Sequence, residues 1–153
     1  MGRIVGSLCV LTACRNHQHR GVLISWVSQA TFNPPGVMLA ISQEQSDQLI
    51  AEPGDQFVLN ILKEGRTIRR HFSEQISNSF EAVTTQPASN GCLIIEEALA
   101  YLECTVQNRL GFDDAFAQGS SDHILLNATV DCGEVLENQG ITAIQYRKSG
   151  SHY

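Results

Sequence analysis

Two segments in the later part of the chain alternate apolar and polar residues, and this alternation limits the possible folds more than any other feature of the sequence. In residues 98–106 one face is apolar, while Tyr101, Glu103 and Thr105 point the other way. Successive side chains of a β-strand point to opposite faces of a sheet, so both segments are predicted to be antiparallel strands with one buried face. The inward positions predicted for the second segment, residues 123–132, are Ile124, Leu126, Ala128, Val130 and Cys132.

The remaining elements are also predicted to be mainly strands. Further strands are expected at residues 3–14, 21–31, 37–41, 56–62 and 142–147. Short helices are expected at residues 46–51, with Ser46 as N-cap, and at residues 66–72. In the strand at residues 56–62, Asn60 is predicted to bond to backbone groups rather than to a ligand. Strands at this spacing, without strand–helix–strand alternation, predict a single mainly β domain over residues 1–153, a closed or nearly closed antiparallel barrel.

The composition excludes several classes of function. A net charge of −6 at pH 7 and a pI near 5.2 provide no basic face for nucleic acid or for an anionic membrane surface. No apolar run approaches the roughly 20 residues of a membrane span, and no signal-peptide pattern is present, so a cytoplasmic protein is expected. The five cysteines form no C-x-x-C pair and do not cluster with histidine. They are predicted to be reduced and mostly buried, and no metal site is predicted.

A polar, hydroxyl-rich segment, residues 25–36, carries the strongest functional signal. Ser25, Ser28, Gln29 and Thr31 stand among apolar neighbours and run into a double proline. A core strand carries such residues only where they have polar partners, and the edge of a flat heterocycle would provide them. The alternative is an exposed edge strand whose polar residues face water.

Three further segments join residues 25–36 in one recognisable pattern: residues 54–60 (GDQFVLN), 98–104 (ALAYLEC) and 147–150 (RKSG). Together they resemble the flavin reductase-like family of FMN-binding split barrels, and most nearly the C-terminal flavin reductase domain of cyanobacterial-type flavodiiron proteins. The resemblance implies an antiparallel FMN-binding split β-barrel with a few short helices. It also implies that the chain is the C-terminal piece of a longer protein with upstream β-lactamase-like di-iron and flavodoxin-like domains.

The function implied by the resemblance is that of an oxidoreductase in electron transport. The domain would take electrons from NADH or NADPH onto FMN and pass them to the flavodoxin-like domain. The di-iron centre, which lies only in the upstream domain, would then reduce oxygen to water. A homodimer is expected, since residues 3–14 are apolar on both faces, and another flavodiiron chain is an alternative partner.

The resemblance also assigns roles to particular residues. His123 follows Asp122 where relatives carry Gly-Asp-His, and it is expected to contact the nicotinamide or to compensate charge during hydride transfer. Arg70, His71 and Phe72 are also expected to bind the cofactor, and His71-Phe72 is part of the pattern that carries the resemblance. The flavin ring wall is assigned to Ser25, Trp26, Val27, Ser28, Gln29, Ala30 and Thr31. The phosphate turn is assigned to Ser42, Gln43, Gln45 and Ser46.

The phosphate turn departs from the pattern of related sequences. Residues 42–46 contain no lysine or arginine, and Glu44 adds a carboxylate that repels a phosphate by about 1 kcal/mol or more. FMN affinity is therefore expected to be weaker than in relatives unless Arg69 and Arg70, or Arg147 and Lys148 of a partner subunit, compensate. A flavin-poor structural or dimerisation module of the same multidomain protein is the second hypothesis. An oligonucleotide-binding barrel, the third, is disfavoured by net acidity and few aromatic residues.

Overall fold

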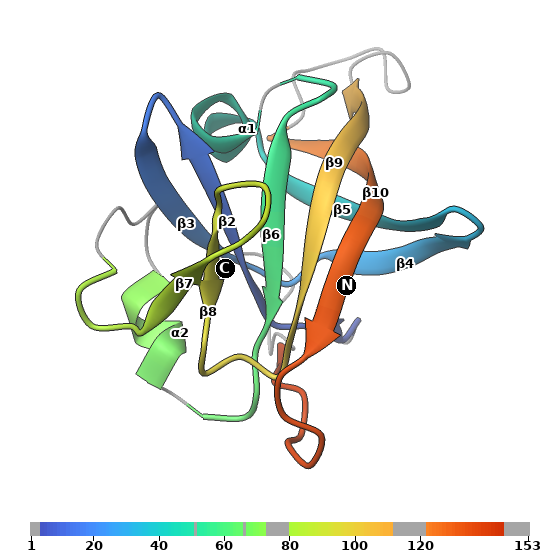
Figure 1. The fold of residues 1–153 in the computed structure, drawn as a ribbon. Helices are drawn as coiled ribbons and strands as arrows, with labels where there is room; N and C mark the ends of the chain where they lie inside the picture. The colour runs from blue at the N-terminus through green and yellow to red at the C-terminus, as the bar shows by residue number, and fades with distance from the viewer. Residues whose placement is uncertain (1–3, 51, 66, 73–79, 112–121, 146–153) are drawn as a thin grey trace.

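The computed structural model describes residues 4–50, 52–65, 67–72, 80–111 and 122–145. In these residues, seven antiparallel strands form one curled sheet in the order β3-β2-β6-β9-β10-β5-β4 (Figure 1). Its strands are β2 (Cys9–Arg15), β3 (Gln18–Ile24), β4 (Val27–Phe32), β5 (Pro35–Ser42), β6 (Gln56–Ile61), β9 (Ala100–Gly111) and β10 (His123–Val135). The mainly β, antiparallel class predicted from the sequence is confirmed.

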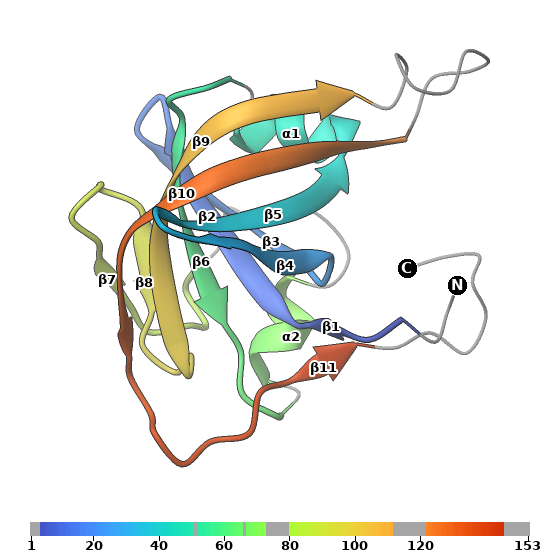
Figure 2. The ribbon, with the colours of Figure 1, turned by 90° about the vertical axis from the view of Figure 1, so that its right-hand side faces the viewer.

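Four short strands and two helices lie outside this sheet. The strands form two antiparallel pairs (Figure 2). The pairs are β1 (Gly6–Ser7) with β11 (Ile144–Gln145), and β7 (Thr85–Pro87) with β8 (Leu93–Ile95). The helices are α1 (Gln43–Leu49) and α2 (Thr67–Phe72), and no helix in the described ranges is long and apolar enough to cross a membrane.

The split of the barrel lies between β3 and β4, which are the two edges of the sheet although they follow each other in the chain. Only Ser25 and Trp26 connect them. The backbone oxygen of Trp26 accepts a hydrogen bond of 2.9 Å from Ala40 N, and a side chain at Gly6 would collide with the Ser25 carbonyl. The single strand predicted at residues 21–31 is therefore wrong, because the chain leaves one edge of the sheet and joins the other at these two residues.

The strand β2 is buried on both faces by the chain itself. Leu11 contributes to the main core inside the curled sheet, whereas Val10 belongs to a second apolar cluster with Phe72 of α2 and Ile95 of β8. The prediction that both faces of this region are buried is confirmed for residues 8–13. The outer face of β2 is covered by α2 and β8, so it is not the surface that a second subunit would cover.

Helix α1 begins earlier than the sequence analysis predicted. Its N-cap is Ser42, not Ser46, and its first turn closes a capping box. The Ser42 hydroxyl accepts from Gln45 N at 3.2 Å, and the Gln45 side-chain oxygen accepts from Ser42 N at 3.3 Å. This reciprocal pair is the S-x-x-Q pattern, which satisfies two amides that a helix start otherwise leaves open.

The alternation that predicted β9 and β10 holds until a bulge. The pairing shifts between Val130 and Cys132, which moves Cys132 opposite Glu103 and leaves it exposed. The inward position predicted for Cys132 is therefore wrong, since one extra residue turns every later side chain to the other face. Glu103, predicted to point outward, is only 3% exposed because Ser89 and Asn90 lie over it.

Candidate functional site

A pocket of about 220 Å³ opens at the split of the barrel. Its apolar wall includes Val22 and Ile24 at the end of β3 and Ile41 near the end of β5. The pairing of β5 with β4 ends at Leu39, which lies opposite Val27, the first residue of β4. The part of β5 after this pair therefore borders the split. The polar residues that line the pocket are Ser25, Ser42, Gln45, Arg69, His123 and Gln145.

His123 stands at the start of β10 between an acid and an indole. Its Nδ1 lies 3.0 Å from the Asp122 carboxylate, and its ring centroid lies 4.7 Å from that of Trp26, with the planes tilted by 41°. The hydrogen bond and the charge interaction with His123 hold the pKa of Asp122 below its ordinary value. A carboxylate at Nδ1 favours the tautomer that carries its proton there.

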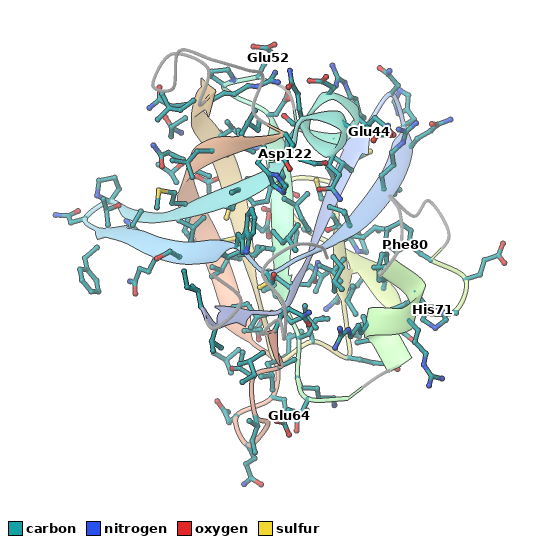
Figure 3. All side chains as sticks on the ribbon, turned by 180° about the vertical axis from the view of Figure 1, so that it is seen from behind. Glu44, Glu52, Glu64, His71, Phe80 and Asp122 are labelled. Carbon is teal, nitrogen blue, oxygen red and sulfur yellow. The ribbon has the colours of Figure 1, made fainter. Side chains whose placement is uncertain are left out.

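Helix α2 presents two residues that are three positions apart to the pocket. Phe72, which is buried, and Arg69, which is exposed, line it, whereas the exposed Arg70 and His71 do not (Figure 3 labels His71). Positions i and i+3 share one helix face, which explains why Arg69 accompanies Phe72. Phe72 is fixed by burial and by contact with Phe80, whose ring centroid lies 5.6 Å away.

The predicted phosphate turn is only partly at the pocket. Ser42 and Gln45 line it, but they are the two partners of the capping box. Ser46 is fully buried and its hydroxyl donates to Ile50 O at 2.9 Å, so it does not reach the pocket. Gln43 is exposed, and its backbone N donates to Asp122 O at 3.0 Å.

The predicted ring wall, residues 25–31, is divided between two hollows. Ser25 lines the split pocket, and the ring of Trp26 contacts His123, which also lines it. Ala30 is exposed and lines neither hollow. A second hollow, of about 320 Å³, is lined by Val27, Ser28, Gln29 and Thr31, together with apolar residues of β2, β5, β6, β9 and β10.

Two residues that line the pocket were not among the predicted site residues: Gln145, and Arg69, in whose place Arg70 was predicted. Gln145 reaches the pocket because β11 pairs with β1, and no sequence pattern marks that contact. The helical spacing to Phe72 is the signal that would have favoured Arg69. Arg147 and Lys148, predicted to compensate from a partner subunit, lie outside the described residues.

Comparisons with known proteins agree on one family. A family model described as "Flavin reductase like domain" matches residues 1–152. The protein named "Putative diflavin flavoprotein A 4" of Nostoc sp. strain PCC 7120 is 57% identical over 99% of this chain. The chain spans about a quarter of the length of the curated relatives that it matches.

Solved structures share the fold at low sequence identity. The NADH:FAD oxidoreductase SgcE6 of Streptomyces globisporus, in complex with NAD and FAD fragments, aligns with a TM-score of 0.78 at 19% identity, over 95% of this chain and 83% of that chain. The flavin reductase HpaC complexed with NADP+ aligns with a TM-score of 0.78 at 15% identity, over 97% of this chain and 90% of that chain. At these identities the likeness is one of fold.

Proposed function

The chain belongs to the flavin reductase like domain family, and from that premise we propose that its split pocket binds FMN and that the domain acts as an NAD(P)H:flavin oxidoreductase. The observation that carries the proposal is the meeting of apolar walls, a histidine and an arginine in one pocket. Residues of β3, β5, α1, α2, β10 and β11 contribute to it. A flat ring with a polar edge and an anionic tail matches such a lining.

We assign different roles to the residues that line the pocket. Phe72, Val22 and Ile41 offer the apolar surface that excludes water from a bound ring. Ser25 supplies a hydroxyl to its polar edge, and His123, fixed by Asp122, can hold or release a proton at Nε2. FMN, when bound, supplies the hydride and electron chemistry that these side chains lack.

A homodimer is part of the proposal. The split pocket, at about 220 Å³, is smaller than the roughly 300–1,000 Å³ of most small-molecule sites. It therefore fits only part of FMN, and we propose that a second subunit covers the rest. Phe32 on the β4–β5 hairpin, which projects from the barrel in Figure 1 and is 85% exposed, is a suitable contact.

The longer protein is proposed to be a flavodiiron protein of the cytoplasm. The length of the relatives, and their name of diflavin flavoproteins, support further domains. We propose that upstream flavodoxin-like and β-lactamase-like di-iron domains receive the electrons and reduce oxygen to water. Deleting this domain from the full protein should abolish oxygen consumption driven by NADH or NADPH, while chemically reduced flavin restores it.

Titration of the purified 153-residue chain with FMN tests the flavin site. We expect quenching of FMN fluorescence at micromolar protein and, without oxygen, bleaching of the flavin absorbance by NADH or NADPH. The His123→Ala variant should retain FMN but reduce it more slowly. A folded dimer that binds no FMN would contradict the proposal and favour the structural module.

A further inference from the structure

We propose that Arg69 is the anchor of the FMN phosphate in this chain, in place of the turn that begins α1. The inference rests on the proposed flavin function and names the residue that distinguishes FMN from a flavin without phosphate. Arg69 lines the split pocket from α2, and Ser42 and Gln45 line the same pocket from α1.

The start of α1 is closed to a phosphate. Ser42 and Gln45 satisfy each other's amides, and the Gln43 amide is taken by the Asp122 carbonyl. The Ser46 hydroxyl is committed to Ile50 O. An anion here would have to break these hydrogen bonds and approach the carboxylate of Glu44, which lies in the first turn. With seven residues, α1 also has little macrodipole to offer.

Arg69 is unlike the other arginines that the structure describes. Arg15 donates to Asp47 O, Arg20 to Gln48 and Gln18, and Arg109 forms an ion pair with Asp47. Arg70 also has a partner. Arg69 alone among the described arginines has no hydrogen bond or ion pair with a described residue. A guanidinium with all its donors open at the wall of a pocket fits a phosphate, which accepts two parallel N–H bonds.

The overall charge strengthens this assignment. In a chain of net charge −6, a cation at a pocket that has no partner among the described residues favours an anionic ligand there. Among the described lining residues, Arg69 is the only lysine or arginine. Phe72, three residues after Arg69 on the same helix face, also lines the pocket. The flavin ring of FMN could therefore contact Phe72 while its phosphate contacts Arg69.

A comparison of FMN with riboflavin tests the role of Arg69, because riboflavin lacks only the phosphate. We expect Arg69→Gln to raise the Kd of FMN by about ten- to a hundredfold, the usual value of charge-assisted hydrogen bonds, while the Kd of riboflavin stays within about twofold. Arg69→Lys keeps the charge without the planar fork and should fall between. Lys63→Gln removes the same charge from a surface pair with Glu137 and serves as the control.

Riboflavin binding also shows whether each variant is folded, so a loss of FMN binding alone cannot come from unfolding. Equal weakening of both flavins by Arg69→Gln, or no change in either, would overturn the assignment. A selective effect in Arg70→Gln but not in Arg69→Gln would also overturn it. An increase only in the KM for NADH would move Arg69 to the nicotinamide phosphates instead. If the unaltered chain binds riboflavin and FMN equally, the phosphate anchor fails while the flavin function stands; if it binds neither, both fail.

Discussion

Replacing Asn60 by leucine should destabilise the barrel without weakening flavin binding. Asn60 is fully buried in β6, where its Nδ2 lies 3.2 Å from Val10 O and 3.4 Å from Leu93 O. Its Oδ1 accepts from Ile95 N at 2.7 Å. The side chain therefore joins β2 and β8 across the wall of the barrel, which confirms the prediction that it bonds to backbone groups.

The expected loss follows from the groups that leucine leaves behind. The Ile95 amide is buried, and an orphaned buried N–H costs roughly 1–3 kcal/mol. Loss of the donor to Val10 O adds about 1 kcal/mol, whereas Leu93 O keeps the Thr12 hydroxyl as a partner. Leucine has the same number and branching of side-chain heavy atoms as asparagine, so no cavity is left, but its larger methyl groups crowd the buried site and add to the loss. The two hydrogen-bond contributions alone sum to about 2–4 kcal/mol, out of the roughly 5–15 kcal/mol that stabilises a typical domain.

Urea unfolding followed by circular dichroism measures this loss as a lower midpoint at an unchanged slope. The matched control is Asn108→Leu, on an exposed position of β9, which should shift stability by less than about 0.5 kcal/mol. A loss for Asn60→Leu no larger than that of the control would refute the accounting of buried amides. A folded Asn60→Leu protein that had lost FMN would instead make Asn60 a ligand contact.

Two further substitutions test other parts of the structure. A methyl group at Gly21 would lie 2.7 Å from the buried ring of Phe72, so Gly21→Ala should cost about 1–3 kcal/mol and lower the unfolding midpoint, and an unchanged midpoint would contradict this packing. Burial raises the pKa of Glu103, but hydrogen bonds from Ser89 and Asn90 outweigh it and hold the pKa below the ordinary value. The charged form is thus favoured in the folded state, and its stabilisation is present above the unfolded-state pKa and lost as the pH falls through the folded-state pKa. The stability difference between the unaltered chain and Glu103→Gln should therefore shrink under acid, and a difference independent of pH between about 7 and 3 would count against it.

The strands were predictable from the sequence where one face is buried along the whole element. Ile124, Leu126 and Ala128 are all buried in the main core, as the alternation of β10 predicts. The prediction fails at Cys132 because a bulge depends on the register with the neighbouring strand. It fails at Glu103 because another part of the chain covers a face that would otherwise meet water.

The candidate site was less predictable than the fold, because its residues meet through the split. A polar segment such as residues 25–31 does not itself reveal where the chain crosses from one sheet edge to the other. The start of α1 carried a readable signal, since Ser42 and Gln45 have the spacing of a capping box, but Ser46 offers a competing N-cap four residues later. Arg69 and Arg70 are neighbours of the same type, and only the helix face separates their environments.

The position of the site follows from the topology, whereas its ligand preference depends on single side chains. Because β3 and β4 are consecutive in the chain yet lie at opposite sheet edges, any sequence with this strand order has a split next to the short link between them. Edge strands leave backbone groups unpaired, and a gap between two edges is therefore a place where a ligand gains polar contacts without disturbing the core. A solved structure with 19% identity to this chain shares the fold, with a TM-score of 0.78. The anion anchor has no such constraint, because Arg69 on α2 and the start of α1, through Ser42 and Gln45, border the same pocket. A basic residue at either place could therefore bind a phosphate while the barrel stays the same.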